Sequence, residues 1–137
     1  MVFNIKRQIN EKDAVERIYK NPTTLNVVGM DDIKPSDTYE NQYYFHVKYQ
    51  FEDGTRFDAS YSFYKTNDGK YTCTSSSKLY ALLKTFLHLN PLYDKSVDFE
   101  YNDVYELLEN KKFVATAIVQ TIGSNNHLYI VAKDVIE

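Results

Sequence analysis

Apolar and polar residues alternate most regularly between Tyr43 and Phe51. Every second position there is apolar or aromatic: Tyr43, Phe45, Val47, Tyr49 and Phe51. This period-two pattern predicts a strand with one buried face. Asp53-Gly54 follows directly, and Asp-Gly is a strong hairpin signal. The returning strand repeats the alternation, with apolar residues at Phe57, Ala59, Tyr61 and Phe63.

Four further segments have strand patterns. They are a first strand at Thr24–Val28, a short strand at Lys70–Thr74, and two closing strands at Lys112–Ile122 and His127–Ile136. The polar turn between residues 123 and 126 has an ordinary length for a hairpin connection. The closing strands therefore form a second predicted hairpin.

Helical spacing appears in three places. Residues 10–20 predict a short helix capped by Asn10 and stopped by Asn21-Pro22. Ser75-Ser76-Ser77 caps a second helix that runs to about Leu89, with a buried stripe at Leu79, Leu82, Leu83 and Phe86. A third, short helix is predicted at Asp103–Glu109, with Asp103 as its cap.

This order of elements predicts a mainly β fold with minor α content. A helix between the third and fourth of five strands is the arrangement of an oligonucleotide/oligosaccharide-binding (OB) Greek-key barrel. We expect residues 1–137 to form one such domain, with residues 1–22 as an N-terminal helical extension. An SH3-like barrel and a sheet packed on one helix are the alternatives.

Composition narrows the possible environments and chemistry. The chain has 137 residues, with 13 Tyr, 8 Phe, no Trp, one Cys and a net charge of −3. Residues 1–10 lack the apolar core of a signal peptide, and no apolar run is long enough to cross a membrane. These features predict a cytoplasmic protein. The lone Cys73 excludes an intramolecular disulfide and is expected to be a small buried residue.

The sequence has no catalytic signature. The four glycines are not clustered as a phosphate-binding loop requires. His46, His88 and His127 are scattered, with no pair at metal-ligand spacing. We therefore expect a protein that is not an enzyme and that uses no metal or cofactor.

Binding by the barrel surface fits the sequence better. OB folds hold oligonucleotides on the face of their second and third strands, where aromatic rings stack on bases and basic side chains meet phosphates. The predicted outward strip and its continuation mix both residue types: Tyr44, His46, Lys48, Arg56, Tyr64, Lys65, Lys70 and Tyr71. Several nearby carboxylates dilute its positive charge, including Asp58 and Asp68.

The C-terminal half resembles a family of small proteins of Gram-positive bacteriophages and prophages. The stretch SSSKLYALLKTFL, an acidic spacer, VYELLENKKFVATAIV and LYIVAKDV carry the resemblance. The matching positions are Lys78, Leu79, Leu82 and Leu83 in the helix, and Leu108, Lys111, Lys112, Phe113 and Ala115 at the strand entry. Asn110 replaces the usual glycine and can also take a left-handed conformation. The resemblance implies an OB-fold single-stranded DNA-binding or replication-accessory protein.

Together with this resemblance, the sequence predicts a protein that binds single-stranded DNA without sequence specificity in phage or mobile-element replication or recombination. If a phage encodes it, we expect it in the cytoplasm of the host cell. Replication or recombination proteins are possible partners, and open strand edges make a homodimer plausible. The competing hypothesis is a protein-interaction module or an inhibitor of a replication or host protein. It rests on residues 93–110, which carry six carboxylates and one lysine.

Overall fold

Strands make up most of the regular structure, which confirms the predicted mainly β class. The computed structural model describes residues 7–136. Its elements, in chain order, are α1 (Glu11–Lys20), β1 (Thr23–Met30), β2 (Lys34–Pro35), β3 (Gln42–Phe51), β4 (Arg56–Lys65), β5 (Tyr71–Thr74), α2 (Lys78–Phe86), β6 (Ser96–Phe99), α3 (Tyr101–Leu108), β7 (Lys112–Ile122) and β8 (Asn125–Ile136).

All the strands belong to one antiparallel sheet. Its order is β6-β5-β4-β3-β1-β7-β8, and β2 pairs separately with β3. Within the described residues β8 pairs only with β7, and β4 pairs with β3 and β5. The sheet is therefore open between β4 and β8. It has eight strands, two more than the six segments with strand patterns, and the predicted five-stranded barrel is not confirmed.

Two strands were not predicted because their local patterns are weak. β2 has only two residues, both exposed, so it has no alternation to detect. β6 lies inside the acidic segment 93–110, where the sequence predicted only the short helix at Asp103–Glu109. This strand forms by pairing with β5, with Val97 opposite Cys73.

The helices begin and end close to their predicted limits. The Asn10 side chain accepts a hydrogen bond from the Asp13 N–H, as the capping pattern predicts. α2 ends at Phe86 and not at Leu89, because His88 takes a left-handed conformation with φ 54°. α3 begins two residues before its expected cap, and Asp103 instead accepts from the Glu100 N–H inside the first turn. Asn110 has φ 56°, the left-handed conformation expected of it.

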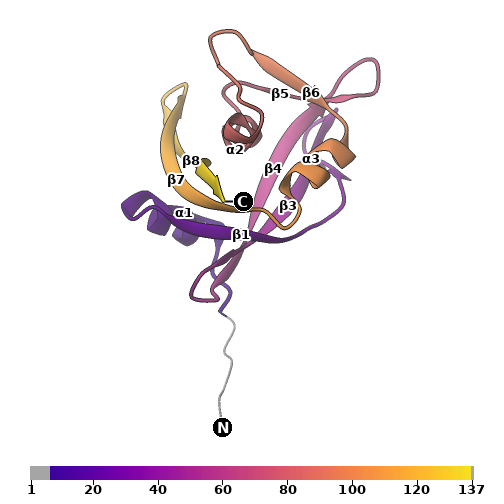
Figure 1. The fold of residues 1–137 in the computed structure, drawn as a ribbon. Coiled ribbons are helices and arrows are strands. Elements are labelled where there is room, and N and C mark those ends of the chain that lie inside the picture. The colour runs from indigo at the N-terminus through magenta and orange to yellow at the C-terminus, as the bar shows by residue number, and fades with distance from the viewer. Residues whose placement is uncertain (1–6, 137) are drawn as a thin grey trace.

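The sheet curves around α2, with the β7–β8 hairpin on one side of the helix and β4 with β5 on the other (Figure 1). The inward positions of β3 and β4 that the alternation predicted are fully buried from Phe45 to Phe63. α1 contacts β4, β7 and β8, and its buried residues Ala14, Val15 and Ile18 join the same hydrophobic core. The N-terminal helix therefore packs into the same core as the sheet.

Candidate nucleic-acid interface

Five of the eight predicted binding residues share the outward face of the β3–β4 hairpin. Successive side chains of a strand point to opposite faces, and the inward face of this hairpin is buried. The outward side chains are Tyr44, His46 and Lys48 on β3, and Arg56 and Tyr64 on β4. We call these five residues the outward strip.

The β3 part of the outward strip is held in place by Asp31. The Asp31 carboxylate accepts hydrogen bonds from the His46 main-chain N–H and from its ring Nδ1, the latter over 2.8 Å. The Tyr44 ring packs edge-on against the His46 ring, with centroids 5.6 Å apart. Partial burial by itself would raise the pKa of Asp31, but the His46 hydrogen bonds and the Lys34 ammonium 3.5 Å away outweigh it and lower that pKa.

The two cations of the outward strip border one depression in the surface. Lys48 and Arg56 line it together with Asp58, residues of β1 and Gln8, and its volume is about 420 Å³. Asp58 lies directly opposite Lys48 in the β3–β4 register. The Arg56 guanidinium donates to Gln50 over 2.7 Å, which fixes its orientation. The depression therefore presents two positive groups and one carboxylate to a ligand.

Tyr64 is the most accessible aromatic ring of the outward strip. The residue is 51% exposed, and it stands beside Gln42, its partner on β3. An exposed ring at the end of a strand can stack on a base without moving the backbone. Tyr44 and His46 are half-buried by comparison.

Three of the predicted binding residues do not belong to this face. Tyr71 packs against Phe63 with ring centroids 5.0 Å apart, so it lies on the core side of the sheet. The Lys65 ammonium lies 5.9 Å from the centre of the Tyr43 ring, on that same side. Lys70 is exposed but sits in the turn between β4 and β5, where its main-chain N–H donates to Thr66. The prediction that β5 continues the strip was wrong because β5 pairs with β4 with Tyr71 opposite Lys65.

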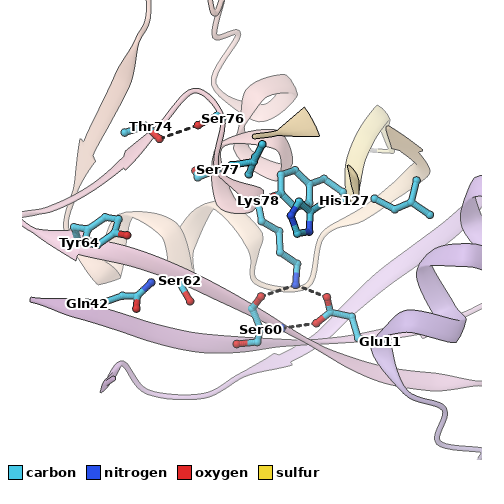
Figure 2. A pocket seen from close by; sticks show the side chains of 13 residues that line it. Glu11, Gln42, Ser60, Ser62, Tyr64, Thr74, Ser76, Ser77, Lys78 and His127 are labelled. Atoms are coloured by element: carbon cyan, nitrogen blue, oxygen red, sulfur yellow. Dashed lines mark hydrogen bonds and ion pairs between the residues drawn. The ribbon is translucent and has the colours of Figure 1, made fainter. Parts of the chain in front are cut away.

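Sequence reasoning also missed a groove between β4 and β8, shown in Figure 2. Its volume is about 560 Å³, and it opens where a closed barrel would join these two strands. Its polar lining comes from α1, the β3–β4 hairpin, the end of β5, the start of α2 and β8. The polar residues are Glu11, Gln42, Ser60, Ser62, Tyr64, Thr74, Ser76, Ser77, Lys78, His127 and Tyr129. The only sequence signal for it was the run of small hydroxyl residues before α2.

Two of the lining residues, Glu11 and Lys78, form an ion pair. The Lys78 ammonium binds the Glu11 carboxylate and donates to the Ser60 carbonyl over 2.6 Å, while Glu11 accepts from the Ser60 N–H over 2.9 Å (Figure 2). Both hydrogen-bonding groups of the strand residue Ser60 are thus satisfied by side chains. Lys78 is the first residue of α2, the helix to which the family resemblance assigned it. Because its ammonium binds the main chain of β4, the side chain lies at the open edge of the sheet.

The single cysteine of the chain lies in the core. Cys73 is 1% exposed, and burial raises the pKa of its thiol to about 11, against a weaker lowering by a hydrogen bond with Ser77. No group of three or more potential metal ligands occurs among residues 7–136. In that same range, no helix has the length and apolar character needed to span a membrane.

Comparison of the chain with protein-family models, with curated proteins and with solved structures gives no match. The phage-family resemblance therefore stays a prediction.

Proposed function

We propose that the protein binds single-stranded DNA with little sequence preference, as a phage or mobile-element protein of replication or recombination. The observation that carries this proposal is the outward strip, in which the rings of Tyr44, His46 and Tyr64 share one sheet face with Lys48 and Arg56. Rings stack on any base, and cations neutralise phosphates whatever the sequence. The chemistry requires no cofactor.

The order of the long strands supports the same proposal. β4-β3-β1-β7-β8 is the order of an OB barrel whose third and fifth strands have separated, with α2 between the third and fourth strands along the chain. OB barrels are often partly open, and they bind oligonucleotides on the strand 2–3 face. In this chain the corresponding face is that of β3 and β4, which carries the outward strip.

The test is the fluorescence anisotropy of a labelled oligo-dT at low salt. We expect Tyr64→Ala to lose about 1–3 kcal/mol of binding, roughly a 5- to 150-fold weaker Kd. Tyr19→Ala is the matched control, because Tyr19 is 53% exposed but lies on α1. We expect Lys48→Ala to lower the slope of log K against log salt by about 0.7, and Lys20→Ala to leave that slope unchanged.

Three results would refute this proposal. They are an absence of binding by the unaltered protein, binding that does not weaken as salt is added, and equal losses in Tyr64→Ala and Tyr19→Ala. Circular dichroism of each variant checks that the fold is retained.

A second candidate function is protein docking, favoured by the loop after α2. Leu92 and Tyr93 are 73% and 81% exposed there. The loop is nevertheless ordered by Asn90, whose side chain accepts from the Leu92 N–H and whose carbonyl accepts from the Tyr93 N–H. A fixed apolar projection beside the acidic segment 93–110 suits a partner protein with a basic rim. This candidate, unlike the first, predicts no affinity for oligo-dT.

A further inference from the structure

The groove between β4 and β8 adjoins the face that carries the outward strip. Three of its lining residues, Ser60, Ser62 and Tyr64, are outward residues of β4. Ser62 lies opposite Tyr44 in the β3–β4 register, and Ser60 lies opposite His46. Residues paired in this way on one face are direct neighbours, and Tyr64 belongs to both the outward strip and the groove. A ligand on the outward strip therefore reaches the groove by crossing a single strand.

The surface beyond the other side of the outward strip is acidic. Asp31 binds His46 there, and its carbonyl accepts a hydrogen bond from the Tyr101 hydroxyl of α3. α3 belongs to the segment 93–110, which carries six carboxylates and one lysine. Lys34 offsets only one of these negative charges. A polyanion that extended past β3 would therefore be repelled.

The groove has no such excess of negative charge. Glu11 is the one acidic residue among the described residues that line it, and it is paired with Lys78. The rest of the polar lining consists of hydroxyl groups, one amide and one imidazole. Hydroxyl and amide groups are common partners of phosphate and sugar oxygens. The groove, with a volume of about 560 Å³, can therefore accept a polyanion without net repulsion.

Aromatic rings stand on both sides of the groove. Tyr64 lines it from β4, and His127 and Tyr129 line it from β8 (Figure 2). His127 and Tyr129 are alternate residues of one strand, so they share a face. Their rings stack with centroids 6.1 Å apart and an angle of 18° between the planes. Because His127 is exposed, its ring can take a base on the side away from Tyr129.

We propose that a single strand of DNA bound on the outward strip continues past β4 into this groove and stacks a base on His127. The strand then crosses the sheet from Tyr44 over Ser62 and Tyr64 to β8, and away from the acidic segment. This inference rests on the proposed function and adds a second stacking platform to it, on a hairpin 63 or more residues further along the chain than Tyr64.

Anisotropy titrations of a labelled oligo-dT of about 16 nucleotides, the upper end of the usual site size, test the proposal. We expect His127→Ala to weaken binding about 5- to 150-fold, the loss of one stacked base. His127→Phe keeps a ring at this position and should retain most of the affinity. Tyr93→Ala is the matched control, because Tyr93 is 81% exposed on the loop after α2, and it should leave the Kd unchanged.

A charge placed on the path gives a second measurement. Ser62→Glu introduces a carboxylate at an exposed position between the outward strip and the groove. It should weaken binding more at low salt than at high salt, because salt screens the repulsion. Ser96→Glu makes the same change at an exposed residue of β6 and should have no comparable effect.

The outcomes separate this inference from the proposed function. If oligo-dT does not bind the unaltered protein, both are overturned. If Tyr64→Ala and Lys48→Ala weaken binding while His127→Ala behaves like Tyr93→Ala, the proposed function stands and the path through the groove is wrong. A loss in His127→Phe as large as that in His127→Ala would also overturn stacking on His127. Circular dichroism of each variant checks that the fold is retained.

Discussion

Tyr49 and Tyr61 are core residues that carry polar atoms. Both side chains are fully buried, and their hydroxyls share a hydrogen bond of 2.8 Å. Burial raises the pKa of both phenols, so they stay protonated at neutral pH. Each hydroxyl is the hydrogen-bond partner of the other, so removing one hydroxyl leaves the other without that partner in the core.

We expect Tyr61→Phe to lower the free energy of unfolding by about 1–3 kcal/mol, because the Tyr49 hydroxyl then loses its partner in the core. The double change Tyr49→Phe/Tyr61→Phe should cost clearly less than the sum of the single changes, since no unpaired hydroxyl remains. Urea unfolding curves of the four proteins form the double-mutant cycle. Additive losses would mean that the hydroxyls do not depend on each other.

At the scale of elements, side chains from two helices bind main-chain groups at the open edge of β4. β5 pairs with β4 only at Tyr64 and Lys65. Further along the strand, the main-chain groups of Ser60 bind Glu11 at the start of α1 and Lys78 at the start of α2. The Lys78 ammonium also lies 5.0 Å from the centre of the Tyr61 ring. Side chains of the two helices thus bind the main-chain groups of Ser60, to which a neighbouring strand would pair in a closed barrel.

Removing one partner of this ion pair should cost more than removing both. The Lys78 and Glu11 side chains are 21% and 28% exposed, so each charge is only partly solvated without the other. We expect Lys78→Met to destabilise by about 1–3 kcal/mol, below the range for fully buried pairs, and Glu11→Gln/Lys78→Met to recover part of the loss. Urea unfolding measures both. An exposed lysine, as in Lys20→Met, is the control and should change stability by less than about 0.5 kcal/mol. A loss in Lys78→Met as small as that would show that the pair is not structural.

At the scale of the whole molecule, one hydrophobic core joins all three helices to the sheet. Val15 of α1, Leu82 of α2 and Val104 of α3 belong to the same cluster as Phe45 and Phe113. Because no element has a core of its own, unfolding of one helix exposes residues that the other elements need.

We therefore expect unfolding to be a single cooperative transition. Far-ultraviolet circular dichroism reports the strands and helices, and tyrosine fluorescence reports the core, since the chain has 13 Tyr and no Trp. The two urea curves should coincide. A separate early transition in circular dichroism would show that α1 unfolds independently of the sheet.

The sequence by itself determined the features that depend on neighbouring residues. The alternation from Tyr43 to Tyr64 decided which side chains of β3 and β4 are buried, and so which of them form the outward strip. The caps at Asn10 and Ser77 decided where α1 and α2 begin. Hydrophobic periodicity and helix capping involve residues that are close together in the sequence, so the sequence alone predicts them.

Only the tertiary structure decided how the elements meet. Glu11 and Lys78 are 67 positions apart in the sequence. No local pattern predicts that both side chains bind the edge of β4, where the sheet stays open. Tyr71 was expected outside and lies inside, because its face depends on the register of β5 with β4 and β6. Strand register and edge contacts join segments distant in sequence, and their energies appear only when the chain is folded.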